Sequence, residues 1–127
     1  MKGIVVSVSG ELTVRDFDRP IYTSVGAFIN GCAEHVRPQN LPSPYCMFVD
    51  EDFLSKYPIT KKYLNEIGCW LYKTHIYGSP ILGTFVIFKD TITTDGVETV
   101  GLDDEDITYL NAYLKKVFSF LRRKNND

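Results

Sequence analysis

The residues best suited to chemistry in this chain are three cysteines and two histidines. Cys32 and His35 lie three positions apart, and Cys46, Cys69 and His75 follow at wider spacings. These side chains supply enough donors for zinc, but residues three apart on a strand point to opposite faces, and no Cys-x-x-Cys pair is present. We therefore expect no metal site, and we expect the cysteines to be small buried thiols.

A cysteine–histidine nucleophile, formed by Cys46 or Cys69 with His75, is the second chemistry that these residue types allow. A reactive thiol needs an electropositive, partly exposed setting. Cys46 instead lies in an apolar segment, where burial raises the pKa of a thiol. We expect no catalytic group and no cofactor, and hence no enzyme. The odd number of cysteines, without regular spacing, indicates reduced thiols in the cytoplasm.

The charged residues have simpler roles. Acidic groups at 50–52 and 103–106 begin predicted helices, where the helix dipole favours them, and this explains them better than acid–base catalysis does. The basic residues near the end suit a solvated helix C-terminus; they are Lys115, Lys116, Arg122, Arg123 and Lys124. The formal charge of -2 predicts no nucleic-acid partner, because such proteins usually carry a basic excess.

Two further classes are excluded by apolar patterning. The longest apolar run, at 80–88, is much shorter than the roughly 20 residues that span a bilayer. The segment that opens the chain is too briefly apolar for a secretory signal. We therefore expect no membrane partner.

The first part of the chain predicts a hairpin and a helix. Residues 3–9 form a strand with Ile4, Val6 and Val8 on one face, followed by a turn at Ser9-Gly10 and a partner strand. A helix follows, with Asp18 as its cap, Pro20 in its first turn and Gly31 as its end. Its apolar stripe consists of Ile21, Val25, Phe28 and Ile29.

The middle of the chain predicts short elements. Residues 32–36 and 45–49 form strands on either side of a proline-rich loop at 37–44. Residues 51–57 form one or two helical turns. Thr60 caps a second short helix that runs to Ile67 and is closed by Gly68. Residues 69–77 fit either a strand or an extended connection.

The last part contains the clearest signals. Residues 80–89 form a strand that is apolar on both faces, which predicts a central position, with a bulge or close backbone approach at Gly83. Residues 91–100 turn at Asp95-Gly96. The C-terminal helix starts with reciprocal caps at Asp103 and Asp106. Together these elements predict a single α+β domain over residues 1–127, with a small mixed or mainly antiparallel sheet of about four to six strands, a long C-terminal helix and two or three shorter helices.

Several short segments recur in the same order in one group of small domains. They are residues 1–6, 31–36, 47–51, 58–61, 77–87 and 101–107. In this order the chain resembles a domain family of unknown function found in phages, plasmids and gut-bacterial mobile elements. The resemblance implies no catalytic residues; it implies the company of small accessory proteins, several kinds of which block host defences by stoichiometric binding.

The leading hypothesis is therefore a non-enzymatic inhibitor of a bacterial anti-phage defence protein, acting in the cytoplasm of the carrier cell. Aromatic residues make up 13% of the chain and commonly anchor interfaces. The candidate contact residues are Tyr45, Trp70, Tyr72, Tyr77 and Asp95. The aromatic and apolar surplus also favours a homodimer.

The alternative hypothesis is a small-molecule binder that sequesters a nucleotide signal of host defence. Such a site combines a stacking aromatic ring with a few cations in a concave pocket. Tyr72, Lys73, His75 and either Arg122 or Arg123 are the candidates.

Overall fold

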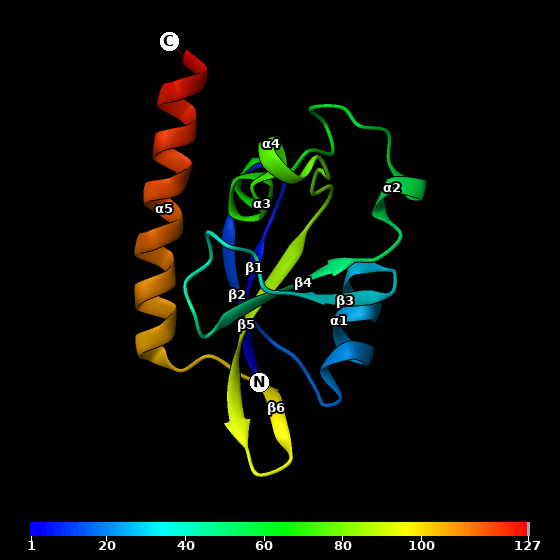
Figure 1. The fold of residues 1–127 in the computed structure, drawn as a ribbon, viewed down its shortest axis with the longest axis vertical. Helices are drawn as coiled ribbons and strands as arrows, with labels where there is room; N and C mark the ends of the chain where they lie inside the picture. Colours follow the sequence, from blue (N-terminus) through cyan, green and yellow to red (C-terminus); the bar gives the residue numbers. More distant parts are fainter. Residues whose placement is uncertain (127) are drawn as a thin grey trace.

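The fold confirms the predicted α+β class. The computed structural model describes residues 1–126, and all their side chains except those of residues 75, 77, 125 and 126. Six antiparallel strands form one open sheet in the order β2-β1-β5-β4-β3, with β6 paired to the far part of β5 (Figure 1). The strands are β1 (Lys2–Val6), β2 (Leu12–Asp16), β3 (Ala33–Val36), β4 (Tyr45–Asp50), β5 (Phe85–Thr93) and β6 (Gly96–Val100).

Helices cover both faces of the sheet. The long helix α5 (Asp104–Asn126) and α1 (Ile21–Ile29) lie on opposite sides (Figure 1). Three further short helices connect β4 to β5. With α1 they make four shorter helices among the described residues, whereas we expected two or three. The three connecting helices are α2 (Phe53–Lys56), α3 (Glu66–Tyr72) and α4 (Thr74–Tyr77).

The larger core lies between the sheet, α5 and α3. Alternate residues of β1, β4 and β5 point to this face, and fully buried Ile4, Phe85 and Ile87 pack against Leu110 and Leu114 of α5. The smaller core lies on the other face, under α1. There the intervening strand residues meet Ile21 and Val25 of the helix; they are Val5, Cys46, Phe48, Val86 and Phe88.

Strand β5 occupies the centre of the sheet, as its apolar residues predicted. It pairs with β1 on one side and β4 on the other. The strand starts later than expected, at Phe85. Residues 80–84 form a separate segment before it, in which Leu82 makes an isolated β-bridge with Leu64 and Gly83 has a φ of 80°. The β1–β2 hairpin is also confirmed, but β1 ends at Val6, so Val8 lies in the turn rather than on the strand.

Helix α1 differs from its prediction at both ends. Pro20 occupies the N-cap position, and no side chain caps the helix; Asp18 instead accepts a hydrogen bond from Ser24 through its backbone carbonyl. Asn30 ends the helix in the left-handed region with a φ of 55°, in place of Gly31. Asn tolerates this conformation because its short amide bonds locally, so it substitutes for glycine.

The helix expected from Thr60 to Ile67 is wrong, as is the strand or extended connection expected at 69–77, where α3 and α4 lie. The side chain of Asn65 accepts a hydrogen bond from the Gly68 backbone N–H at 3.0 Å and starts α3 five residues later. Gly68 therefore lies inside α3, where a Cβ atom would come within 2.7 Å of Ile81. Here glycine permits close packing of α3 against Ile81, in the segment that precedes β5, rather than ending a helix.

The start of α5 confirms the predicted capping. The Asp106 N–H donates to Asp103 Oδ1 at 2.8 Å, and the Asp103 N–H donates to Asp106 Oδ2 at 2.9 Å. Asp50, by contrast, belongs to buried β4 rather than to a helix start; its Oδ2 accepts from Lys56 Nζ at 2.7 Å. Among the described helices, none combines the length and apolar character needed to cross a bilayer.

Candidate functional site

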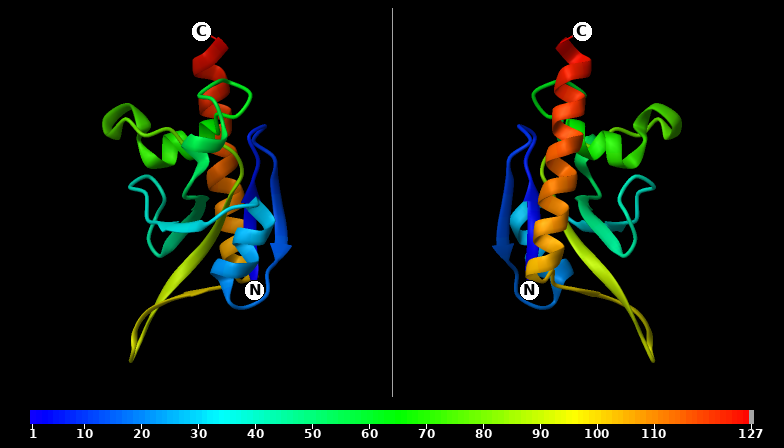
Figure 2. Two further views of the ribbon diagram at one scale, coloured as in Figure 1. Left: turned by 90° about the vertical axis from the view of Figure 1, so that its right-hand side faces the viewer. Right: turned by 90° about the vertical axis from the view of Figure 1, so that its left-hand side faces the viewer.

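The β5–β6 hairpin extends away from the rest of the molecule (Figure 2). Polar side chains gather at its base. Asp90 lies at the centre of this cluster. Its Oδ2 accepts from Arg37 Nε at 2.7 Å and lies 3.0 Å from His35 Nε2. Its Oδ1 accepts from Thr99 Oγ1 at 2.9 Å and from the Cys46 thiol at 3.5 Å. The five side chains form one connected polar group, the Asp90 cluster.

Strand pairing brings these five residues to one face. Asp90 pairs with Thr99 across β5 and β6. Cys46 pairs with Phe88, two residues before Asp90, so that Cys46 and Asp90 point to the same side. His35 pairs with Phe48, two residues beyond Cys46, and Arg37 follows His35 by two. Side-chain alternation thus places residues from four strands together at the end of the smaller core.

The Asp90 carboxylate is ionised at neutral pH. Burial alone raises the pKa of a carboxyl group, but the hydrogen bonds from Arg37, Thr99 and His35 outweigh burial and hold the pKa of Asp90 below its ordinary value. Only 9% of its side chain is exposed, so a charge at this depth needs such partners.

Cys46 has the opposite electrostatic character. Burial, aided by the negative charge of Asp90, raises the pKa of its thiol to about 12. The thiol donates to Asp90, and His35 Nε2 also faces Asp90. A catalytic cysteine needs a histidine next to its thiol to accept the proton, but the thiol of Cys46 contacts the Asp90 carboxylate instead. This arrangement does not produce a thiolate at neutral pH. The raised pKa expected for Cys46 from its apolar segment is confirmed.

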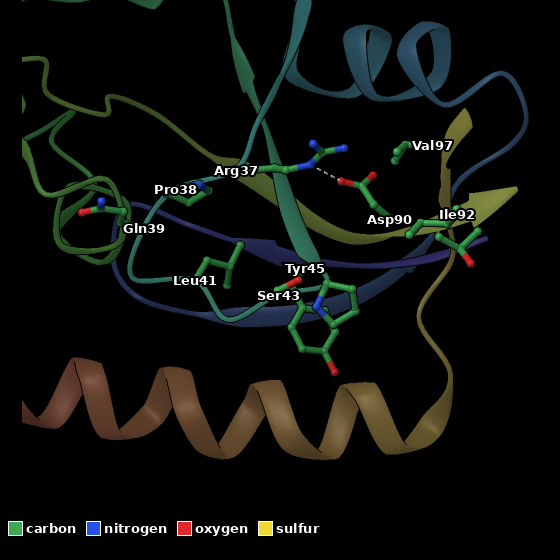
Figure 3. Close-up of a pocket in the computed structure, with 11 residues that line it drawn as sticks. Arg37, Pro38, Gln39, Leu41, Ser43, Tyr45, Asp90, Ile92 and Val97 are labelled. Atoms are coloured by element: carbon green, nitrogen blue, oxygen red, sulfur yellow. Dashed lines mark hydrogen bonds and ion pairs between the residues drawn. The ribbon is translucent and has the colours of Figure 1, made fainter. Parts of the chain in front are cut away.

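Beside the cluster is a surface hollow of about 790 Å³ between the loop at 37–44 and the β5–β6 hairpin (Figure 3). Arg37 and Asp90 lie on its wall, and Leu41 and Tyr45 line the side of the loop and β4. Ile92 and Val97 line the side of the hairpin, and these residues are 87% and 58% exposed. The hollow thus combines apolar walls with one guanidinium–carboxylate pair.

The edge of β5 is open along this hollow. β4 stops pairing with β5 at Lys89, and the Asp90 N–H donates to the Pro44 carbonyl at 2.8 Å. Backbone groups alternate in direction along an antiparallel strand, so the N–H and C=O of Ile92 point to the same side as those of Asp90. Beyond Asp90, no described strand pairs with that side of β5.

On the opposite face, Tyr45 joins β4 to the start of α5. Its hydroxyl donates to Asp106 Oδ1 at 2.8 Å, and its ring stacks on Tyr109 with centroids 5.9 Å apart. Lys89 Nζ lies 2.6 Å from Asp106 Oδ2. Although burial raises the pKa of a carboxyl group, the hydrogen bonds from Lys89, the Asp103 backbone and Tyr45 lower that of Asp106 to about 2.

The structure does not bring the expected binding residues together. Among the described residues, Tyr45 is the only one of them that lines the hollow. Asp95 lies at the hairpin tip, Trp70 packs against Tyr113 with centroids 6.3 Å apart, and Tyr72 and Lys73 end α3. Arg122 and Arg123 are exposed near the end of α5, whereas the side chains of His75 and Tyr77 in α4 lie outside the described residues.

Sequence reasoning missed three of the five residues that meet at the base of the hairpin: Arg37, Asp90 and Thr99. Asp90 follows the apolar run of β5 directly, and Arg37 follows His35 by two positions in a strand pattern. The local signal was a charged residue at the end of each strand. Their proximity depends on strand order, which local spacing does not specify.

Comparison with protein-family models, with curated proteins and with solved structures finds no match to this chain.

Proposed function

We propose that the protein is a non-enzymatic inhibitor that binds an extended segment of a bacterial anti-phage defence protein along the open edge of β5. The observation that carries this proposal is the position of Ile92. It is 87% exposed on a strand whose outer edge has no described partner, beside a hollow of about 790 Å³.

An open strand edge with apolar side chains is a common protein-binding feature. A peptide added to such an edge gains affinity from main-chain hydrogen bonds and specificity from pockets for its alternate side chains. Ile92 and Val97 pair across β5 and β6 and lie on the same face, so they offer a continuous apolar patch to the incoming segment. Proteins usually protect exposed edges of this kind with charges or bulges.

The hollow also specifies a charge on the partner. Arg37 donates to Asp90 through Nε, and the guanidinium carries two further donor nitrogens (Figure 3). The side chain is 56% exposed and Arg37 lines the hollow, so the guanidinium is accessible to a bound group. A carboxylate on the bound segment would accept from these nitrogens in the fork geometry that guanidinium favours. We therefore propose an extended partner segment with an acidic residue near its centre.

The sequence resemblance to domains of phages and other mobile elements supports a defence protein as the partner. Accessory proteins of such elements gain from blocking host defence by simple binding, which needs a surface and no reacting group.

The test is restoration of phage growth in bacterial strains that each carry one defence system. The wild-type protein restores plating in one strain and co-purifies with that system's protein. Ile92→Asp places an unpaired charge in the patch and Ile92→Pro removes the outward N–H, so both abolish restoration. Ile59→Asp is the matched control, because Ile59 is 67% exposed in a remote loop.

Two outcomes would reject this surface. One is a wild-type protein that restores growth in none of the strains; the other is restoration by Ile92→Asp as complete as by Ile59→Asp. A concentration-dependent dimer that Ile92→Asp dissociates would instead assign the open edge to a second copy of the chain, the homodimer expected from composition.

A second candidate function is sequestration of a nucleotide signal. The hollow falls within the roughly 300–1,000 Å³ typical of ligand pockets, and its lining includes both Arg37 and Tyr45. A panel of cyclic nucleotides would raise the melting temperature of the wild-type protein but not of Arg37→Gln. Arg123→Gln is the control, since Arg123 lies outside the hollow. A flat response across the panel would remove this candidate.

A further inference from the structure

Three donor atoms of different chemistry meet in the Asp90 cluster. The nearest ligand atoms of His35, Cys46 and Asp90 all lie within 4.8 Å of one another. We infer that these three residues form a zinc-binding site at the base of the β5–β6 hairpin. The site shares Asp90 with the wall of the hollow, but Ile92 and the open edge of β5, which carry the proposed partner surface, hold none of its ligands.

The separations of the donor atoms suit tetrahedral coordination. Asp90 Oδ1 lies 3.2 Å from His35 Nε2 and 3.5 Å from Cys46 Sγ. Zinc bonds of about 2.0–2.2 Å to nitrogen or oxygen and about 2.3 Å to sulfur place neighbouring tetrahedral ligands roughly 3.3–3.6 Å apart. Two of the three separations therefore lie within a few tenths of an ångström of the tetrahedral values, and the third, between His35 Nε2 and Cys46 Sγ, is at most 4.8 Å.

The donor set selects zinc among the common ions. Magnesium and calcium bind oxygen ligands, whereas one imidazole, one thiolate and one carboxylate suit zinc. On binding, the Cys46 thiol releases its proton to solvent as the zinc–sulfur bond forms, and His35 turns the lone pair of Nε2 to the ion. Thiolate and carboxylate together balance the charge of the ion, and water takes the fourth position from the side of the hollow.

The neighbours of Asp90 form the outer shell that such a site needs. Arg37 holds Oδ2 at 2.7 Å, and Oδ1 accepts from the Cys46 thiol, while His35 Nε2 lies within 3.2 Å of both oxygens. Thr99 donates to Oδ1 at 2.9 Å and fixes its orientation. Outer-shell groups of this kind typically change metal affinity by about 10–100-fold.

This site replaces the combination of cysteines and histidines considered from spacing alone. Cys32 is exposed at the start of β3, and Cys69 bonds to the backbone of Ile81 through its sulfur, with the Ile81 N–H donating at 3.3 Å. The ligand that local spacing did not suggest is the carboxylate of Asp90, which comes from a strand 44 residues after Cys46.

The experiment is titration of the full chain with Zn²⁺ by calorimetry and with Co²⁺ by absorption, in a phosphine reductant. The wild-type protein binds one ion, and Co²⁺ gives the intense near-ultraviolet band of a thiolate ligand. Cys46→Ser removes that band, and both Cys46→Ser and His35→Gln weaken Zn²⁺ binding at least about tenfold. Thr99→Val weakens it by about 10–100-fold with the band retained.

Cys32→Ser and Cys69→Ser are the matched controls and keep both the band and the affinity. Circular dichroism verifies the fold of each variant; if Cys46→Ser does not fold, the band of the wild-type protein and the affinity of His35→Gln decide. Absence of a thiolate band in the wild-type protein, or a band that moves with Cys32 or Cys69, overturns the inference. Ile92→Asp binds zinc normally, so failure of the zinc site and failure of the partner surface are distinguishable.

Discussion

The hydroxyl of Tyr45 donates a hydrogen bond to Asp106 Oδ1 at 2.8 Å, which fastens the first residue of β4 to the first turn of α5. Lys89 from β5 reaches the other oxygen of the same carboxylate at 2.6 Å. Asp106 therefore caps its own helix and also ties that helix to two adjacent strands. Removing any one of these partners leaves the others with an incomplete set of hydrogen bonds.

Tyr45→Phe should lower the free energy of unfolding by about 1–2 kcal/mol, because the variant keeps the ring stacking and loses a hydrogen bond to a charged acceptor. Chemical denaturation measures the change. Tyr22→Phe is the control, since Tyr22 is 55% exposed, and a change within about 0.5 kcal/mol is expected there. In an Asp106→Asn background, Tyr45→Phe should cost clearly less; an equal cost would show that the hydroxyl acts elsewhere.

Acid should remove the contribution of Asp106. The folded-state pKa of about 2 lies below the ordinary value of 3.8, so the ionised carboxylate stabilises the fold above about pH 4 and the benefit disappears as pH falls towards 2. The loss is on the order of 2 kcal/mol. Unfolding of the wild-type protein and of Asp106→Asn should therefore differ most at neutral pH and converge near pH 2. A difference that stays constant over this range would contradict the lowered pKa.

Asn65→Ala should be among the most destabilising single substitutions. Asn65 is fully buried, caps α3 and donates to the carbonyls of Val6 at 3.2 Å and Gly83 at 2.9 Å. Loss of the cap and two buried donors predicts a cost of about 2–4 kcal/mol in denaturant unfolding.

Asn30→Gly provides the contrast to Asn65→Ala. Asn30 is exposed in the left-handed region, where glycine is equally suited, so stability should change by only a few tenths of a kcal/mol. Comparable losses in the two variants would count against the assigned role of Asn65.

Gly68→Ala should destabilise the protein, although alanine usually favours a helix interior over glycine by about 1 kcal/mol. The new Cβ atom would lie 2.7 Å from Ile81 Cγ2 and 3.0 Å from the Phe85 ring, both of which are buried. Overpacking of this kind predicts a loss of about 1–3 kcal/mol in thermal or chemical unfolding. Ser119→Ala, on an exposed part of α5, should be neutral or slightly stabilising. A Gly68→Ala protein as stable as the wild type would show that Ile81 yields easily.

Local patterns predicted the elements whose signals are contained within them. The β1–β2 hairpin, the apolar core of β5 and the capped start of α5 all follow from residues within a few positions of each other. The start of helix α3 could not be predicted from local patterns. Thr60 and Asn65 are both suitable caps, and the choice of Asn65 depends on its bonds to Val6 and Gly83, which lie far away in sequence.

The candidate site was less accessible to sequence reasoning for a similar reason. His35 and Cys46 attracted attention as residue types, but Asp90 and Thr99 read as ordinary residues of a strand and a polar hairpin. The order β1-β5-β4-β3 brings them together, and many strand orders fit the same elements. The binding residues proposed from aromatic content were scattered for the converse reason, since Trp70 and Tyr45 are largely used in packing on α5.

The apolar run of β5 leaves the alignment of this strand weakly specified, since a slip by one residue would still set apolar side chains against both helical layers. Lys89 and Asp90 remove that freedom. They are adjacent, opposite in charge and directed to opposite faces, where Lys89 meets Asp106 and Asp90 meets Arg37. A slip by one residue would turn Lys89 towards Arg37 and Asp90 towards Asp106. Both side chains would then face a like charge and lose their ion pairs. The adjacent, oppositely charged pair of Lys89 and Asp90 therefore specifies one register of β5 in the sheet.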